Sequence, residues 1–211
     1  MSPETSKHTR QMKVAVVKYN AGNIFSVVHA LKRMGVEPLL TDSEVELRSA
    51  DRVIFPGQGE ASNAMNYLRE RGLDRVIPSL TQPVLGICIG QQLMCRHSEE
   101  GDTDCLGIFD AEVKRFQPVK HEDKIPHMGW NSIQNCQIQN SKSSLFKGLD
   151  GEFVYFVHSF YVPVCEDTAA ITDYIHPFSA AMQKDNFFAT QFHPEKSGEV
   201  GQQILRNFLE L

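Results

Sequence analysis

Residues 83–94 read PVLGICIGQQLM, and this stretch decides the fold. Its first part, 83–87, is a mostly apolar run of the kind found in strands that are buried on both faces of a parallel sheet. A helix is predicted over 90–96. The Gly-x-Cys-x-Gly pattern between them puts Cys88 at a sharp strand-to-helix turn, the arrangement of a nucleophile elbow. Gly86 and Gly90 are expected to relieve crowding where strand and helix nearly touch.

Strands and helices alternate upstream of this elbow. Apolar runs predict strands over 13–17, 37–40 and 52–55, and helical spacing predicts helices over 27–34, 43–50 and 61–71. Such β–α repeats favour right-handed crossovers and a mostly parallel sheet. Downstream, strands are predicted over 111–116, 131–139, 152–162, 169–174 and 187–192, some of them as antiparallel hairpins, before a final helix over 198–211. The expected fold is α/β, with a mostly parallel central sheet flanked by helices and additional antiparallel strands.

The composition excludes several classes of protein. The 211 residues are 41% hydrophobic and 22% charged, with a net charge of -5, which is the balance of one soluble globular domain. This acidic chain is not expected to bind nucleic acid or an anionic membrane. No apolar run approaches the ~20 residues that span a bilayer. Residues 1–11 are polar and are expected to form a flexible leader, with the domain over 12–211.

The five cysteines do not suggest a disulfide framework or a metal site. Their number is odd and no CxxC pair occurs, so neither a set of disulfides nor a thiolate zinc site is expected. The sequence predicts a cytoplasmic protein with free thiols, no metal and no cofactor. Four of these thiols are interpreted as small buried hydrophobic side chains, and Cys88 is the exception.

The chemistry around Cys88 follows from its position. A helix N-terminus favours a thiolate, and the N–H of Ile89 can donate to an oxyanion that forms beside the sulfur. A cysteine that is merely buried in tight strand–helix packing is an equally valid interpretation of this pattern alone. A second feature favours catalysis. His193 follows a predicted strand, and Glu195 lies two residues later, so on extended backbone both side chains point the same way. Cys88, His193 and Glu195 thus match a nucleophile, a base and an orienting carboxylate.

Two segments carry a resemblance to a known family. GICIGQQ (86–92) and QFHPEKSG (191–198) resemble class I glutamine amidotransferases, whose fold is flavodoxin-like. Within this family the resemblance extends to the glutaminase subunits of imidazole glycerol phosphate synthases, through YNAGN (19–23), IPHMGWN (125–131) and YFVHS (155–159). It covers nearly the whole chain from about residue 13, and the PHMGWN and FHPEKSG motifs are more selective than the catalytic residues alone.

The resemblance implies a role for further residues. Glutamine would be hydrolysed through a thioester on Cys88, with the oxyanion met by Ile89 and by a backbone N–H of the loop that contains Gly59. The residues that would bind glutamine are Gly57, Gln92, Glu100, Ser159 and Phe160. Two positions depart from the family pattern: Gln58 stands where PGVG has an apolar residue, and Gln91 stands where Met is usual.

The resemblance also implies a partner. Ammonia would pass to a cyclase subunit, a (β/α)₈ barrel, in a heterodimer that makes imidazole glycerol phosphate and aminoimidazole carboxamide ribonucleotide in histidine biosynthesis. The candidate interface residues are Asn23, Met128, Trp130, Asn131 and Tyr155. Trp is a common interface anchor, although a core or lid aromatic is an equally good interpretation of Trp130.

Three alternatives remain open from the sequence. The chain could serve a different synthase, such as anthranilate or pyridoxal phosphate synthase. A free-standing hydrolase of γ-glutamyl compounds would show high activity without a partner. A non-catalytic scaffold is disfavoured by the presence of Cys88, His193 and Glu195 together.

Overall fold

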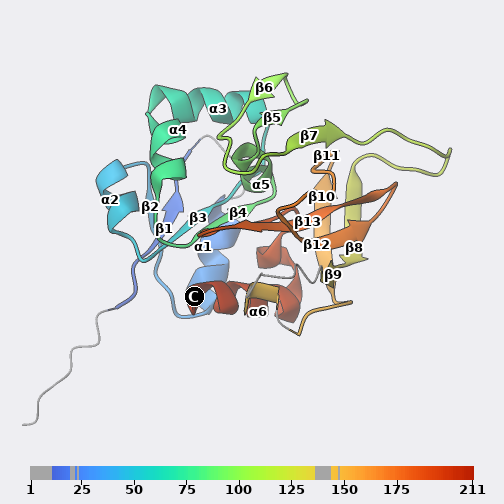
Figure 1. Ribbon diagram of the computed structural model, residues 1–211. Helices are drawn as coiled ribbons and strands as arrows, with labels where there is room; N and C mark the ends of the chain where they lie inside the picture. The colour runs from blue at the N-terminus through green and yellow to red at the C-terminus, as the bar shows by residue number, and fades with distance from the viewer. Residues whose placement is uncertain (1–10, 20–21, 23, 136–143, 147) are drawn as a thin grey trace, which may run out of the picture.

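The computed structural model describes residues 11–19, 22, 24–135, 144–146 and 148–211, and the structural statements concern these residues. Residues 1–10, and with them most of the predicted leader, lie outside this part of the chain. An eight-stranded sheet runs through the molecule in the order β2-β1-β3-β4-β14-β13-β12-β9 (Figure 1). Its strands are β1 Val14–Val17, β2 Leu39–Thr41, β3 Arg52–Phe55, β4 Val84–Ile87, β9 Gln134–Asn135, β12 Thr168–Asp173, β13 Pro177–Lys184 and β14 Phe187–Thr190.

The sheet has a parallel half and an antiparallel half. β2, β1, β3, β4 and β14 are parallel, and β13, β12 and β9 continue the sheet in antiparallel pairs. This arrangement confirms the predicted fold class. β13 was not predicted as a strand, because its sequence PFSAAMQK is rich in residues with weak strand preference. A turn at Asp185, with a φ of 51°, joins it to β14 in an antiparallel hairpin.

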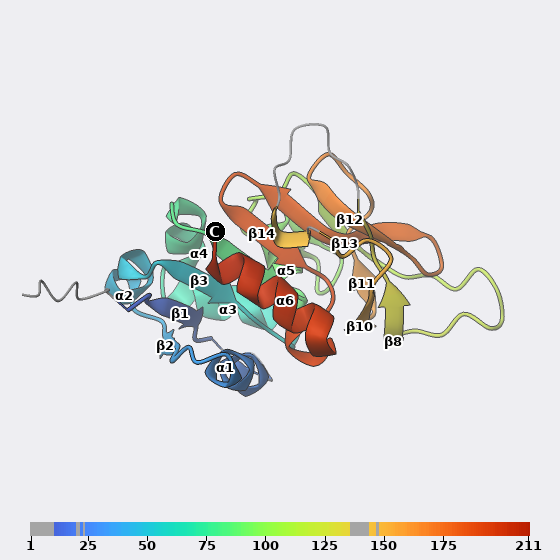
Figure 2. The ribbon, with the colours of Figure 1, turned by 90° about the horizontal axis from the view of Figure 1, so that it is seen from below.

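Helices cover both faces of the sheet. α1 Ile24–Arg33 and α6 Gly198–Leu209 pack on one face, as the view from below shows (Figure 2). α2 Glu44–Ser49, α3 Ala61–Glu70, α4 Leu73–Val76 and α5 Ile89–Met94 contribute to the apolar core of the other face. The longer helices bury one apolar side, such as Ile204, Leu205 and Phe208 of α6, which are fully buried, whereas every residue of α5 is buried.

Two smaller sheets complete the molecule. β8 His127–Ser132 pairs with β10 Phe153–His158 as a two-stranded antiparallel ribbon. A four-stranded sheet is formed by β5 His97–Ser98, β6 Thr103–Asp104, β7 Glu112–Arg115 and β11 Phe160–Tyr161. The single strand predicted over 152–162 is therefore two strands. The chain leaves the ribbon at Ser159, whose carbonyl accepts from the N–H of Phe116, and then pairs with β7.

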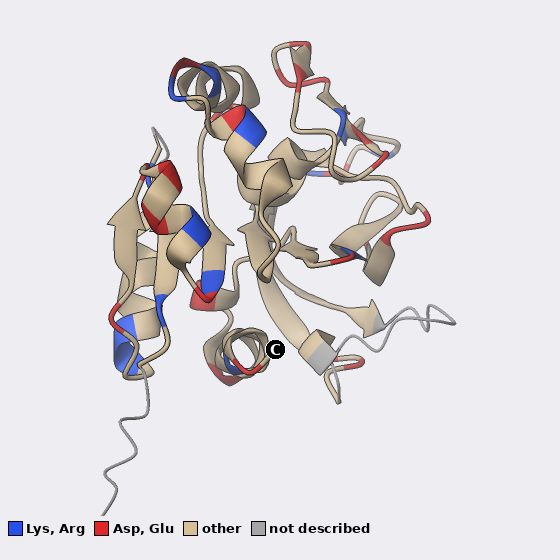
Figure 3. Cartoon of the chain, turned by 60° about the vertical axis from the view of Figure 1, so that its left-hand side comes forward, with Lys and Arg blue, Asp and Glu red and all other residues tan. Residues whose placement is uncertain are grey.

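Charged residues lie mainly on helices and loops, while the strands of the central sheet carry few (Figure 3). Lys, Arg, Asp and Glu segments are interspersed along these outer elements. This distribution is expected, because both faces of the sheet are covered and an unpaired charge there would be costly. Among the described residues, the helices are all too short or too polar to cross a membrane.

Candidate active site

The strand-to-helix turn has the geometry that its sequence predicts. Cys88 lies between β4 and α5 with a φ of 54° and a ψ of -107°, and its N–H donates to Thr190 O at 2.7 Å. A Cβ added to Gly90 would lie 2.1 Å from the backbone O of Phe55, and one added to Gly86 would lie 2.9 Å from Gly90 C. The two glycines therefore allow the close approach of strand and helix that holds Cys88 in its unusual conformation.

The structure brings His193 and Glu195 together beside Cys88. His193 follows β14, and Glu195 lies in the 3-10 turn Pro194–Lys196. The Nδ1 of His193 lies 2.8 Å from Glu195 Oε1, and both side chains are almost completely buried. The hydroxyl of Ser197 donates to His193 O at 2.6 Å, and the N–H of His193 donates to Tyr155 O at 3.0 Å. These bonds hold the backbone of His193, and the contact with Glu195 orients its ring.

The charges around His193 favour its protonated form. Burial lowers the pKa of His193, but the negative charges of Cys88 and Glu195 outweigh it and raise the pKa to about 10. Its Nε2 is buried and makes no hydrogen bond of standard geometry among the described residues, and Cys88 is the side chain close enough to act on it. This nitrogen is thus the one available for proton transfer. The catalytic roles of these side chains stay a prediction, to which this geometry gives a physical basis.

A cavity of about 370 Å³ opens beside the cysteine. It is lined by Gln58, Gly59, Cys88, Ile89, Gln92, Glu100, Pro126, Val157, His158, Ser159 and Phe160. Most of the residues predicted to bind glutamine or the oxyanion are therefore gathered on its wall. Gly57 is different, because it lies buried behind the wall, where an added Cβ would come within 1.9 Å of Tyr19 Oη and 2.3 Å of Ile89 Cγ2.

Two polar residues of the cavity have defined partners. Gln92 Nε2 donates to Phe160 O at 3.0 Å and to Gln191 Oε1 at 2.9 Å. Glu100 Oε2 accepts from the N–H of Ala61 at 2.9 Å. Burial raises the pKa of Glu100, the Ala61 N–H opposes this shift, and Glu60 adds to it. The wall thus offers one carboxylate and several backbone groups to a small polar ligand.

The loop over 56–59 is held from behind. The hydroxyl of Tyr19 donates to Pro56 O, and the N–H of Gly22 donates to Gln58 O at 2.7 Å. Gly59 has a φ of 151°, a conformation that side chains with a Cβ rarely adopt. Burial and the charge of Cys88 raise the pKa of Tyr19 well above its ordinary value, so Tyr19 keeps its proton as a donor.

Gln191 was not predicted as a site residue, yet it touches the nucleophile. It is fully buried, and its Nε2 lies 3.6 Å from Cys88 Sγ. The sequence held one signal, since Gln191 lies two residues before His193 and extended backbone would put both on one side. His127 and His158 were also missed. Their Nδ1 and Nε2 atoms lie 2.9 Å apart, and burial lowers both pKa values, to about 4 and about 3.

The candidate interface residues fall on two different faces. Met128 and Trp130 are 67% and 56% exposed, and the rings of Trp130 and Tyr155 pack edge to face at 6.1 Å across the ribbon. Asn131 lies on the opposite face, where its Nδ2 donates to Asp173 O at 2.9 Å. Strand alternation is the reason, because 128 and 130 point one way and 131 the other. Asn23 lies outside the described residues.

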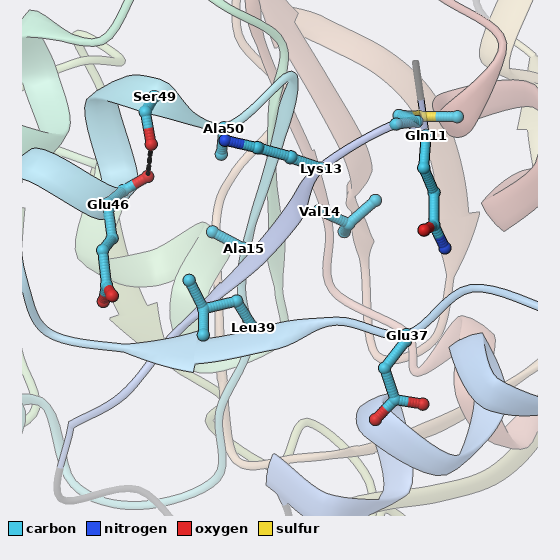
Figure 4. A pocket seen from close by; sticks show the side chains of 10 residues that line it. Gln11, Lys13, Val14, Ala15, Glu37, Leu39, Glu46, Ser49 and Ala50 are labelled. Carbon is cyan, nitrogen blue, oxygen red and sulfur yellow. Dashed lines mark hydrogen bonds between the residues drawn. The ribbon is translucent and has the colours of Figure 1, made fainter. Parts of the chain in front are cut away.

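A second and larger hollow, of about 500 Å³, shares no lining residue with the cavity beside Cys88 (Figure 4). Its wall comes from residues 11–15 and from the elements β2 and α2, near the N-terminal end of β1. In a parallel sheet this end lies opposite the carboxyl ends, where Cys88 is found. Among the described residues there is also no group of three His, Cys, Asp or Glu side chains that could hold a metal ion. The site at Cys88 is therefore the candidate for function.

Comparisons with known proteins show the family to which the chain belongs. The family described as "Glutamine amidotransferase class-I" matches residues 15–211. A solved structure of a glutamine amidotransferase from Thermotoga maritima shares the fold, with a TM-score of 0.61 and 15% identity over 95% of this chain and 83% of that one. A second solved structure, also a glutamine amidotransferase, has a TM-score of 0.70 and 19% identity over 93% and 97% of the two chains.

Curated relatives are more similar in sequence. The imidazole glycerol phosphate synthase subunit HisH of Bacteroides thetaiotaomicron is 67% identical over 95% of this chain and 100% of its own length. The HisH subunit of Pectobacterium atrosepticum is 45% identical over the same shares. The chain therefore belongs to the class I glutamine amidotransferase family, and within it to the HisH subunits of imidazole glycerol phosphate synthase.

Proposed function

We propose that this chain hydrolyses glutamine to glutamate and ammonia through a Cys88–His193–Glu195 triad and delivers the ammonia to a cyclase subunit. The observation that carries the proposal is the buried pair of His193 and Glu195 at 2.8 Å beside a cysteine at a strained strand-to-helix turn, all next to a cavity of about 370 Å³. A chain of the HisH family with this arrangement has what acyl transfer needs.

In the first half of the reaction, the Cys88 thiol gives its proton to His193 Nε2, and the sulfur attacks the side-chain amide carbon of glutamine. The tetrahedral oxyanion is met by the N–H of Ile89 and by a backbone N–H of the loop that contains Gly59. The C–N bond then breaks, and the leaving nitrogen takes the proton from His193 as ammonia departs. This leaves a γ-glutamyl thioester on Cys88.

In the second half, water replaces the amine. His193 takes a proton from the water, whose oxygen attacks the thioester carbon, and the carbon–sulfur bond breaks. Glutamate leaves, and the proton on His193 returns to Cys88. Glu195 accepts from the ring N–H at Nδ1, which orients the imidazole and stabilises the imidazolium. The raised pKa of His193 suits this role, because the charge of the thiolate beside it is one cause of the shift.

The cavity supports glutamine as the substrate. Its size falls within the range of small-molecule sites. We assign Glu100 to the α-ammonium group of glutamine and the backbone of Ser159 and Phe160, with Gln92, to the rest of the amino acid. Gly57 serves indirectly, because only a glycine fits between Tyr19 and Ile89 behind the loop.

The exposed face of the ribbon supports the partner assignment. Met128, Trp130 and Tyr155 share this face, and Trp and Tyr are enriched among the residues that dominate binding energies at interfaces. The same ribbon touches the site, because Tyr155 O accepts from the N–H of His193. We assign this face to a cyclase subunit with a (β/α)₈ barrel in a heterodimer. Asn131 instead ties β8 to Asp173 inside the chain.

A coupled assay tests the proposal. The full chain is incubated with glutamine alone, with purified cyclase subunit, and with cyclase plus its nucleotide substrate. Glutamate release should be slow without the partner and should rise by orders of magnitude with both additions. High activity without a partner would indicate a free-standing hydrolase. Activation only by the partner subunit of another synthase would overturn the assignment to imidazole glycerol phosphate synthesis.

Two measurements test the role of Cys88. Cys88→Ala should abolish glutamine-dependent synthesis in the complex and spare synthesis from added ammonium, whereas loss of both would make Cys88 structural. A glutamine-analogue alkylator should leave one adduct, on Cys88. Two of the other thiols differ in environment: burial raises the pKa of Cys95 well above its ordinary value and that of Cys105 to about 12. Thiols with such pKa values are poor nucleophiles near neutral pH.

A further inference from the structure

The side chain of Gln191 lies between the nucleophile and the wall of the cavity. It directly follows β14, and its backbone N–H donates to Ala180 O at 2.8 Å. Its side-chain Oε1 accepts from Gln92 Nε2 at 2.9 Å, and its Nε2 lies 3.6 Å from Cys88 Sγ. Such a fully buried amide must have partners, and here the sulfur is one of them.

A chain of hydrogen bonds fixes the direction of this amide. The carbonyl oxygen of Phe160 can only accept, so the atom of Gln92 that lies 3.0 Å from it is the NH₂ group. The same NH₂ group is 2.9 Å from Gln191, which must therefore present its oxygen there. If the Gln191 amide were reversed, its NH₂ group would face the NH₂ group of Gln92, and its oxygen would face the sulfur of Cys88. The NH₂ group of Gln191 thus faces Cys88.

The second acceptor site of the Phe160 carbonyl strengthens this assignment. His158 Nδ1 lies 2.7 Å from the same oxygen and must carry the proton to make this bond. Its Nε2 then accepts from His127 Nδ1 at 2.9 Å. The Phe160 carbonyl is therefore held in place by two donors, Gln92 and His158. Because this carbonyl orients Gln92, and Gln92 in turn orients Gln191, the direction of the Gln191 amide rests on a fixed group.

We propose that Gln191 is a catalytic residue that stabilises the Cys88 thiolate by donating a side-chain N–H to its sulfur. The thiol proton passes to His193, the electron pair stays on the sulfur, and no bond to Gln191 forms or breaks. A hydrogen bond to an ionised acceptor is stronger than one to a neutral acceptor, above all in a buried site. Gln191 therefore favours the thiolate both before attack and as the leaving group of the thioester.

This inference rests on the proposed role of Cys88 as nucleophile. The titratable groups that face Cys88 among the described residues are His193, which follows β14, and Tyr19, which follows β1. Behind them, Glu195 holds His193, and His158 lies close enough to influence it. Gln191 adds to these a neutral donor, which does not itself titrate.

The test compares two substitutions of Gln191. Gln191→Glu keeps the size of the side chain and the oxygen that faces Gln92, and replaces only the donor that faces the sulfur. Gln191→Met removes the hydrogen bonds without adding a charge. Each full-length variant is alkylated with iodoacetamide across a range of pH values, and the adduct on Cys88 is quantified by peptide mass spectrometry.

Both variants should require a higher pH for alkylation. The midpoint for Cys88 should rise by about one unit in Gln191→Met, a tenfold loss of rate below the midpoint, and by more in Gln191→Glu, whose carboxylate repels the thiolate. The matched control is Gln91→Met. Gln91 is also a fully buried amide, but its Nε2 donates to Ser179 O at 3.0 Å, so its midpoint should stay that of the wild type.

Activity in the complex gives a second readout. Gln191 is not among the residues that line the cavity, and Gln92 keeps its bond to Phe160 O in the variant, so Gln191→Met should lower kcat about tenfold with a smaller change in KM. If the wild-type complex showed no glutaminase activity but Gln191→Met still shifted the alkylation midpoint, the proposed function would be wrong and the contact between Gln191 and the Cys88 thiolate would still hold. Normal kcat with an unshifted midpoint would overturn this inference alone.

A measurement on the wild-type chain does not depend on whether a variant folds. The side-chain amide protons of Gln191, assigned by their absence in Gln191→Glu or by residue-specific labelling, should move downfield in the ¹⁵N–¹H spectrum as Cys88 ionises. Protons that do not move through this titration would overturn the inference. So would a midpoint that rises in Gln191→Glu but not in Gln191→Met, because charge alone would then explain it.

Discussion

The parallel half of the sheet and the ribbon of β8 and β10 differ in how far they are buried and in what they contribute to function. Every residue of β1, β4 and β14 is buried, because helices cover both faces of the parallel strands. In β10 exposed or half-buried residues alternate with buried ones, so that one face of the ribbon packs on the core and the other is open. The first region positions Cys88 with little tolerance, and the second presents a surface while its backbone holds His193.

This difference teaches where each kind of function can be built. A strained turn such as that of Cys88 persists only where the surrounding packing over-determines it, as the parallel half does. An interaction surface needs apolar side chains that the fold does not require, and the outer face of the ribbon supplies them. Substitutions in the parallel half should therefore lower stability, whereas substitutions on the outer face of the ribbon should weaken binding and leave stability almost unchanged.

The largest effect is expected at the elbow. Gly90→Ala puts a Cβ 2.1 Å from the backbone O of Phe55, and neither backbone can move without disturbing two central strands. The free energy of unfolding should fall by about 4 kcal/mol or more, or the chain should fail to fold. Urea unfolding measures this, with Gly22→Ala as a control, since its Cβ would meet only ordinary contacts from 3.6 Å. Equal stability of both variants would refute the claim of tight packing.

The two faces of β10 can be compared within one strand. Phe156 is fully buried and Phe153 is 56% exposed, so the same substitution at each position isolates the effect of burial. Phe156→Ala should lower the free energy of unfolding by about 3–5 kcal/mol, and Phe153→Ala by about 0.5 kcal/mol or less. Chemical denaturation of both variants is the measurement. Similar losses would mean that the outer face also belongs to the core.

The outer face should matter for binding instead. Trp130→Ala should weaken binding of the cyclase subunit by about 2 kcal/mol, roughly 30-fold, because large aromatic anchors dominate interface energies. Its free energy of unfolding should hardly change. Calorimetric titration with the partner would measure the affinity, with Val45→Ala as a control, since Val45 is 77% exposed but lies on α2. Unchanged affinity in Trp130→Ala would place the interface elsewhere.

A smaller effect should appear as a dependence of stability on pH. Burial lowers the pKa of His127 to about 4 and that of His158 to about 3, below the ordinary value of about 6.5 for an unfolded chain. Between pH 6.5 and 4 the unfolded chain binds protons that the folded chain does not. The contribution of each histidine to stability is therefore fully present above pH 6.5 and should fall by up to about 3 kcal/mol as the pH drops to 4.

The variant His127→Asn checks the source of this dependence. Asn retains a donor near the position of Nδ1 but cannot titrate, so the loss of stability between pH 6.5 and 4 should be smaller than in the wild type. Thermal unfolding at several pH values would show it. The neighbouring groups are His158, which bonds to His127, and Tyr174, whose ring stacks on it at 4.0 Å. An identical pH profile in the variant would exclude His127 as a cause.

The sequence alone determined the parts of the molecule that depend on local pattern. Continuous apolar runs marked the buried strands, and the glycines on either side of Cys88 marked the elbow that the structure contains. The spacing of His193 and Glu195 predicted that their side chains would meet, as they do, but the expected extended backbone is wrong, because the 3-10 turn Pro194–Lys196 brings them together. These features need no information from distant residues.

Only the tertiary structure decided the rest. The direction of the Gln191 amide is set by the Phe160 carbonyl, 31 positions away in the sequence, through Gln92. The face taken by Asn131, the place of Gly57 behind the cavity wall and the break at Ser159 likewise depend on contacts with remote segments. The physical reason is that a hydrogen bond or a close contact needs two partners, and a local pattern describes only one of them.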